Sequence, residues 1–103
     1  MAEIGLSEAD IKQIKEWAAK HVKIKRVYLY GSRARGDHRP GSDIDLAVVM
    51  GFQEWFRWHS DYKENRDLRL SAKVHLEWYQ PNADLERVGR GVEENGVLLY
   101  SSS

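Results

Sequence analysis

Hydrophobic residues recur at two different periods along the chain, and each period predicts its own kind of element. Between residues 8 and 22 the apolar positions follow a helical spacing, at Ile11, Ile14, Ala18 and Val22. Ser7 stands just before this pattern with Asp10 three residues on, which resembles a capping box. The spacing therefore predicts one amphipathic helix from about residue 8 to residue 21.

Three shorter runs have the composition or the alternation of β-strands. "KRVYLY" (25–30) is rich in β-branched and aromatic residues and ends at Gly31. "AKVHLEWY" (72–79) alternates apolar and polar positions. "DIDLAVVM" (43–50) alternates at first and is apolar on both sides in its second half. That pattern predicts a strand covered by helices on at least one face, with its polar beginning exposed.

The other segments give mixed signals. Residues 52–68 carry aromatic residues among charges and suggest a helix, although "HSDYKENRD" (59–67) is polar enough to form a loop. Pro81 and Asn82 predict a turn. Helical spacing then returns up to Gly96, which has the character of a helix C-cap, at Leu85, Val88 and Val92.

Length and composition narrow the classes of protein. A chain of 103 residues fits one domain, residues 1–103, so a large substrate would bind at its surface. The absence of cysteine excludes disulfides, thiolate zinc sites and cysteine nucleophiles. No stretch is apolar enough to span a membrane, and we expect a cytoplasmic protein.

Charge is balanced over the whole chain but not along it. Lys plus Arg and Asp plus Glu both number 16, and no DNA-docking motif is present, so we expect no sequence-specific binding to nucleic acid. The segment from Lys20 to Arg39 has seven basic residues and only one acid, Asp37. This local excess favours contact with an anion, and a solvated basic surface would explain the lysines equally well.

The first candidate for chemistry is the turn after the first predicted strand. Gly31 ends that strand and Ser32 begins a turn, so backbone N–H groups and a hydroxyl would point outward together, as phosphate oxygens require. The turn is not a P-loop, because Gly36 is followed by Asp37 and His38 where that motif has Lys and Ser or Thr. Taken alone, a Gly-Ser pair would more often be an ordinary turn.

The second candidate is the pair of carboxylates at the start of the next strand. Asp43 and Asp45 are two residues apart, so their side chains project from one face with the Cα atoms about 7 Å apart. Two such carboxylates repel each other unless a cation lies between them. One or two carboxylates together with phosphate oxygens are what Mg²⁺ prefers. The spacing fits a metal-bridged nucleotide, whereas an isolated Asp-x-Asp is more often a solvated turn.

The two candidates occur together and in a fixed order. The stretch "GSRARGDHRPGSDIDLAVV" resembles the signature of the minimal nucleotidyltransferase domain of the DNA polymerase beta-like superfamily. The resemblance implies an α/β (α+β) fold, a small mixed sheet flanked by helices. It also implies transfer of a nucleoside monophosphate, AMP from ATP, to an acceptor hydroxyl with Mg²⁺ as cofactor, two ions being possible.

Site residues follow from the resemblance by position. Gly31 and Ser32 would hold the β and γ phosphates, and Asp43 and Asp45 would ligate Mg²⁺. Two arginines of the same loop would add positive charge at the phosphates, Arg33 and Arg35.

One position departs from the family pattern. The family supplies a third carboxylate from a later strand, and here the matching "VHL" places His75 at that position. Glu77 is two residues on and shares the face of His75, so it is the favoured third ligand or general base, with His75 as the alternative. If neither residue serves, nucleotide would bind while transfer is weak.

Two functions remain open at this point. The first is an active nucleotidyltransferase that modifies a partner protein, because 103 residues leave little room for a separate acceptor domain and a protein acceptor suits this length better. The second, also suggested by the resemblance, is an antitoxin-like binding partner of a small helical HEPN-type protein, with weak or lost catalysis. Aromatic residues could provide its contact surface, at Trp55, Trp58 and Trp78, whereas Trp17 has the helical spacing of a core residue.

Overall fold

Helices and strands alternate along the described part of the chain. The computed structural model describes residues 5–21, 23–37, 39, 41–61, 68, 70–80 and 87–102. The elements in chain order are α1 (Glu8–Lys20), β1 (Arg26–Tyr30), α2 (Ser32–Arg35), β2 (Ile44–Val49), α3 (Phe52–Asp61), β3 (Val74–Trp78), α4 (Arg87–Asn95) and β4 (Val97–Ser101). Among these residues no helix has the length and apolar character needed to cross a bilayer.

Helix α1 begins where the sequence predicts it. The Ser7 hydroxyl accepts a hydrogen bond from the backbone N–H of Asp10 at 3.1 Å, which confirms Ser7 as the N-cap. Asp10 is only 6% exposed, and its carboxylate accepts hydrogen bonds from the backbone N–H and the hydroxyl of Ser71. A buried carboxylate needs such partners. This contact ties α1 to the segment that leads into β3.

The strands form one mixed sheet in the order β3-β2-β1-β4. Strand β1 is antiparallel to both β2 and β4, and β2 is parallel to β3. The parallel pair needs a long crossover, and the chain between β2 and β3 contains α3. This arrangement confirms the predicted α+β architecture with a mixed sheet.

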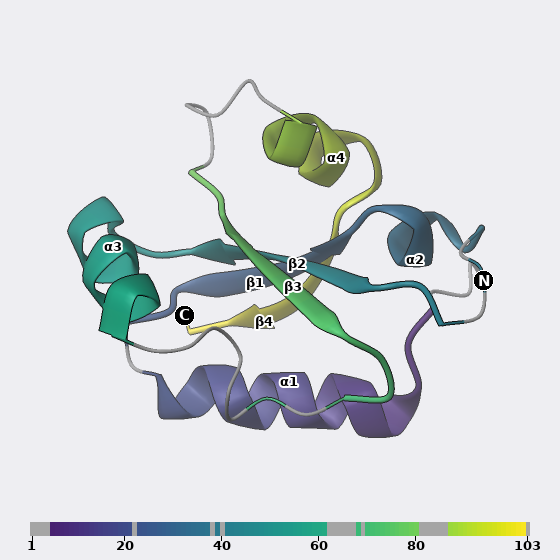
Figure 1. The fold of residues 1–103 in the computed structure, drawn as a ribbon, viewed down its shortest axis with the longest axis horizontal. Coiled ribbons are helices and arrows are strands. Elements are labelled where there is room, and N and C mark those ends of the chain that lie inside the picture. Colours follow the sequence, from purple (N-terminus) through teal and green to yellow (C-terminus); the bar gives the residue numbers. More distant parts are fainter. Residues whose placement is uncertain are drawn as a thin grey trace.

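The sheet lies between two helices, with α1 below it and α4 above it in Figure 1. Alternate residues of the strands pack against α1 in the larger core, which includes Trp17 at 2% exposure and so confirms its predicted core position. The opposite face of the sheet packs in a smaller cluster of Tyr30, Ala47, Val49, Tyr79 and Val92, the last from α4. Outside this smaller cluster, polar side chains can occupy the face of the sheet that α4 covers, which we call the α4 face.

Other predicted elements agree to different extents. Strand β2 begins at Ile44, so Asp43 lies just before the strand rather than in it. Helix α3 is described as far as Asp61, and residues 62–67 of the predicted 52–68 helix lie outside the described residues. The turn predicted at 81–82 and the start of the 85–92 pattern also lie outside them. The N–H of Gly96 donates to the carbonyl of Val92 at 2.8 Å, as expected at the end of α4.

Candidate functional site

Three side chains from neighbouring strands stand in one row across the sheet. The register pairs Tyr30 of β1 with Asp45 of β2, and Asp45 with His75 of β3. The flanking residues Ile44 and Leu46 are fully buried in the core against α1. Because successive side chains of a strand point to opposite faces, the row of Tyr30, Asp45 and His75 lies on the α4 face.

This row forms the floor of a cleft of about 350 Å³. The residues that line the cleft come from β1, β2, β3, α2 and α4, and they are Tyr30, Gly31, Ser32, Arg35, Asp45, His75 and Gly91. The volume is at the lower end of the range for small-molecule sites. A hydroxyl, a guanidinium, a carboxylate and an imidazole therefore face one space large enough for part of a nucleotide.

Gly31 turns the chain from β1 into α2 in a conformation that only glycine adopts readily. Its φ and ψ angles are 80° and −158°. A Cβ atom added here would lie 2.7 Å from Oδ2 of Asp45. The backbone of Gly31 thus lies directly against the carboxylate, and the missing side chain leaves room for that approach. The turn continues as the single helical turn α2, which ends at Gly36 in the left-handed conformation.

Substitution Gly31→Ala is expected to lower the free energy of unfolding by about 2 kcal/mol and to weaken nucleotide binding. The backbone strain and the displaced Asp45 carboxylate both contribute. Gly41→Ala is a matched control, because Gly41 also has a positive φ of 82° but has nothing within 4 Å of an added Cβ. Chemical denaturation and nucleotide titration of both variants measure the effect. Equal losses of nucleotide affinity in the two variants would contradict the role of the Asp45 contact.

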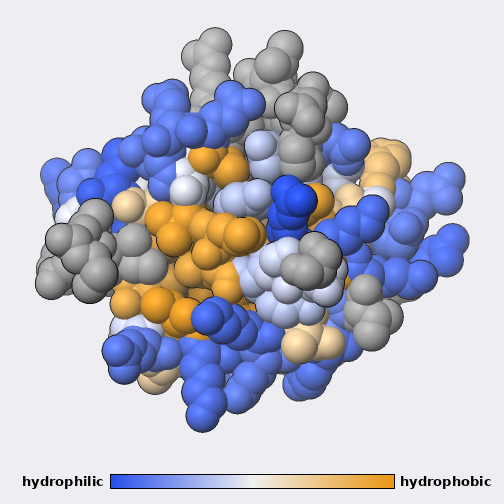
Figure 2. Space-filling model, turned by 180° about the vertical axis from the view of Figure 1, so that it is seen from behind, coloured by the Kyte–Doolittle hydropathy of each residue, from blue (hydrophilic) through white to orange (hydrophobic). Residues whose placement is uncertain are grey.

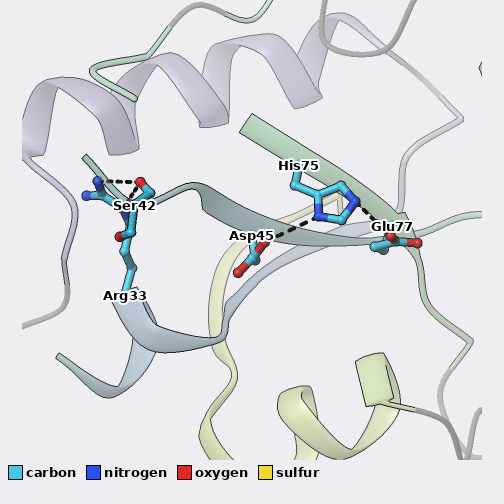
Figure 3. Close-up of polar contacts among 5 residues, drawn as sticks. All are labelled: Arg33, Ser42, Asp45, His75 and Glu77. Atoms are coloured by element: carbon cyan, nitrogen blue, oxygen red, sulfur yellow. Dashed lines mark hydrogen bonds and ion pairs between the residues drawn. The ribbon is translucent and has the colours of Figure 1, made fainter. Parts of the chain in front are cut away.

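Arg33 is directed away from the cleft. It is 8% exposed, its Nη1 donates to the carbonyl of Gly5 at 2.6 Å, and its Nε and Nη2 donate to the carbonyl of Ser42 at 3.2 and 2.8 Å. In Figure 3 the guanidinium group lies beside Ser42, apart from Asp45 and His75. The contact between Arg33 and a phosphate therefore stays a prediction. In this structure the N–H groups of Arg33 donate to backbone carbonyls.

Arg35, by contrast, lines the cleft. Its Nε lies 3.2 Å from Oδ2 of Asp37, and both side chains are exposed, at 45% and 63%. An exposed ion pair of this kind contributes little to stability. The guanidinium can therefore exchange Asp37 for a phosphate group at small cost, which is consistent with the predicted role of Arg35.

The two aspartates predicted as metal ligands differ in their surroundings. Asp45 is half-buried and lines the cleft, whereas Asp43 is exposed and is not among the lining residues. Asp43 lies two residues before Asp45, just ahead of β2. Asp45 is therefore the carboxylate that a group bound in the cleft meets directly, and Asp43 could reach the same group only from the rim.

His75, not Glu77, is the residue of β3 that lines the cleft. His75 pairs with Asp45 in the register, and Glu77 pairs with Ala47 one step further along the sheet. The imidazole bridges the two acids, with Nδ1 at 3.5 Å from Oδ1 of Asp45 and Nε2 at 2.9 Å from Oε1 of Glu77, as Figure 3 shows. The predicted direct role of Glu77 stays a prediction, and here its carboxylate contacts His75.

The donor set of the cleft can be compared with what a divalent cation needs. Within the described ranges, no three His, Asp or Glu side chains converge as ligands of one metal ion. Mg²⁺ does not need three, because it is commonly bound by one or two carboxylates, substrate phosphates and water. Asp45, with Asp43 at the rim, fits such a cation when a phosphate group occupies the cleft beside Ser32.

Two lining residues were not found from the sequence. Tyr30 could have been inferred, because alternation along "KRVYLY" sets it opposite the buried Leu29 at the end of the strand next to Gly31. Gly91 gave no signal, since it reaches the cleft only through the packing of α4 on β1. A Cβ at Gly91 would lie 3.0 Å from Cδ2 of Tyr30, so the glycine allows this close approach.

Residues 12–103 match the family model described as "Polymerase beta, Nucleotidyltransferase", and the chain belongs to that family. No curated protein matches the chain significantly.

Solved structures share the fold. The chain is similar to the "toxin-antitoxin with AMP-PNP", at 23% identity and a TM-score of 0.62 over 90% of this chain and 74% of that chain. A mutant of the toxin-antitoxin MntA-HpeT, with two Asp-to-Glu substitutions two positions apart, is similar at 21% identity with the same TM-score and coverage. A candidate nucleotidyltransferase from Sulfolobus solfataricus is 25% identical, with a TM-score of 0.55 over 89% of this chain and 77% of that chain.

Proposed function

We propose that this protein is a divalent-cation-dependent nucleotidyltransferase that moves AMP from ATP to a hydroxyl group of a partner protein. The observation that carries the proposal is that Ser32, Arg35 and Asp45 line one cleft beside the glycine turn. These groups can bind phosphate oxygens and a cation together. Membership of the nucleotidyltransferase family and the AMP-PNP bound in a similar structure support the choice of reaction and nucleotide.

The reaction places separate demands on the residues of the cleft. The acceptor oxygen forms a bond to the α phosphorus, the bond from that phosphorus to the bridging oxygen breaks, and pyrophosphate leaves with its charge while the hydroxyl proton is released. Ser32 and the backbone of Gly31 would hold the leaving phosphates, and Arg35 would offset their charge. Asp45 and Asp43 would hold a divalent cation such as Mg²⁺, which neutralises phosphate charge and aligns the reacting oxygens.

A protein acceptor is supported by the surface position of the cleft and by the similar structures. Two of these structures are toxin-antitoxin complexes. In the mutant complex, the altered aspartates have the same spacing as Asp43 and Asp45. We therefore place the acceptor hydroxyl on a small partner protein, a helical HEPN-type toxin being the candidate, encoded beside this chain. A protein that acts in this way would work in the cytoplasm.

The second candidate function is an antitoxin-like binding partner with weak or lost catalysis. Two observations favour it: the third acidic position of the family is His75, and large apolar side chains are exposed at Phe52 (59%), Phe56 (65%) and Leu98 (51%). Phe52 also packs edge-on against Trp78, with ring centroids 5.3 Å apart. Figure 2 shows apolar side chains gathered in the middle of one face with hydrophilic ones around them. Such surfaces are typical of contacts with other proteins.

The test is a transfer assay with purified protein, the partner encoded next to it, and ATP labelled at the α phosphate. Label is expected on the partner only when a divalent cation is present, and ATP labelled at the γ phosphate is expected to give none. Label from γ-labelled ATP would instead indicate phosphorylation. Partner binding and nucleotide binding without any transfer would favour the second candidate. Absence of both nucleotide binding and transfer would overturn the proposal.

A further inference from the structure

The side chains of Asp45, His75 and Glu77 form a chain of contacts that the reaction described above does not require. His75 stands between the two acids, and each ring nitrogen faces one carboxylate. The shorter contact, 2.9 Å, joins Nε2 to Glu77, so Nε2 carries the proton that Glu77 accepts. Nδ1 faces Oδ1 of Asp45 at 3.5 Å, so a proton on Nδ1 would lie between these two atoms.

A divalent cation can take the place of that proton, because an imidazole nitrogen gives up its proton when it binds a metal ion. Two neighbouring ligands of an octahedral divalent cation are about 3 Å apart when each bond is about 2.1 Å. Nδ1 of His75 and Oδ1 of Asp45 are 3.5 Å apart in the cleft, so a small side-chain adjustment would let both bind one cation. Phosphate oxygens and water would complete the coordination.

Glu77 is placed to accept a hydrogen bond from the second ring nitrogen of His75. Metal-binding histidines commonly donate their second ring N–H to a carboxylate, which fixes the tautomer and strengthens the ligand nitrogen. Glu77 lies one step along β3 from the cleft and contacts the ring nitrogen that faces away from Asp45. One strand thus supplies both the nitrogen ligand and the group that orients it.

We propose that His75 is a nitrogen ligand of the divalent cation, held by Glu77, and that it shifts the preference of this site from Mg²⁺ toward Mn²⁺. Mg²⁺ prefers oxygen ligands only, whereas imidazole binds first-row transition ions well. Mn²⁺ also accepts carboxylate and phosphate oxygens, so it suits a site of mixed donors. The proposal rests on the proposed nucleotide site and makes His75 the residue that determines its metal specificity.

The test is pulsed electron paramagnetic resonance of the intact protein with Mn²⁺ and α,β-methylene-ATP, an analogue that cannot be cleaved at the α phosphate. A nitrogen coupling to Mn²⁺ is expected, and it should change to the ¹⁵N pattern when the protein is grown with ¹⁵N-histidine, which separates imidazole from the adenine nitrogens. The coupling should be absent in His75→Asp. Wild-type protein without a histidine coupling would overturn the proposal, whether or not the variant folds.

Metal affinities provide the second readout. His75→Asp is expected to lower the ratio of Mn²⁺ to Mg²⁺ affinity about tenfold, and Glu77→Gln to lower Mn²⁺ affinity about tenfold. Glu16→Gln, an exposed acid of α1 on the other side of the sheet, should change neither. An unchanged ratio in a folded His75→Asp variant would overturn the proposal.

The two proposals fail in different ways. If AMP transfer occurs with Mg²⁺ but the Mn²⁺ signal shows no histidine coupling, the proposed function is supported and the proposal that His75 binds the cation is refuted. If the coupling is present but no acceptor is labelled, the metal site stands and the proposed function falls.

Discussion

Substitution Asp45→Asn is expected to lower AMP transfer about a thousandfold, whereas Asp43→Asn is expected to lower it only about tenfold. The difference follows from the positions of the two carboxylates. Asp45 lines the cleft beside the backbone of Gly31 and the ring of His75. Asp43 is exposed before β2 begins, so water competes for its charge and it can reach the nucleotide only from the rim.

Single-turnover transfer at saturating ATP measures this prediction for the wild type and the two variants. Asparagine keeps the shape of aspartate and removes the charge, so each variant reports the loss of a charged ligand. Melting temperatures are the control for folding, because the Asp45 carboxylate lies against the Gly31 turn. Equal losses in the two variants would show that both aspartates hold the cation to the same degree, contrary to this structure.

Local patterns in the sequence were enough to predict most of the elements. The helical spacing after Ser7 predicted α1 to within one residue at its C-terminal end, since the cap and the apolar positions are both local signals. Alternation predicted which residues of β2 face the core against α1, Ile44, Leu46 and Val48. Strand order was a different matter. It depends on which strands pair across long stretches of chain, and the family resemblance gave only a mixed sheet.

Within the site, the limits of sequence reasoning are clearest at the two arginines. Arg33 and Arg35 are two residues apart in the same basic loop, and nothing local separates them. The structure separates them because α2 is helical, so residues two apart point in different directions. Arg35 meets the cleft, and Arg33 meets the backbone of Gly5, 28 positions earlier in the chain. Such a long-range contact has no signature in the sequence.

For a similar reason, the sequence could not decide whether His75 or Glu77 lies beside Asp45. Both residues share one face of β3, and alternation alone cannot say which of them stands beside Asp45. The register of the parallel pair decides it by placing His75 next to Asp45 and Glu77 next to Ala47. A register shift of two residues would therefore decide whether the cleft presents an imidazole or a carboxylate at this point.

Substitution Arg33→Ala is expected to lower the free energy of unfolding by about 3 kcal/mol. The guanidinium is 8% exposed, and it joins the segment before α1 to the loop before β2 through the carbonyls of Gly5 and Ser42. Removing it leaves both carbonyls without these donors. The hydroxyl of Ser42 is already buried without a hydrogen-bond partner in the described part of the chain, so the substitution would add to the unsatisfied polar groups of this loop.

Arg35→Ala is the matched comparison, and the two variants should show opposite patterns. Arg35 is exposed and pairs with the exposed Asp37, so its loss should change stability by less than about 0.5 kcal/mol. Because Arg35 lines the cleft, the same variant should bind ATP about tenfold more weakly. Arg33→Lys should recover part of the stability, since an ammonium group can serve one of the two carbonyls.

Urea denaturation and ATP titration of the three variants decide whether Arg33 stabilises the fold or binds phosphate. A stable Arg33→Ala protein with weakened ATP binding would assign Arg33 to the phosphates and contradict the contacts seen here. An unstable Arg33→Ala protein together with a stable Arg35→Ala protein would show that Arg33 stabilises the site and that Arg35 binds the ligand. The start of β2, and with it the placement of Asp45, would then depend on a residue outside the cleft.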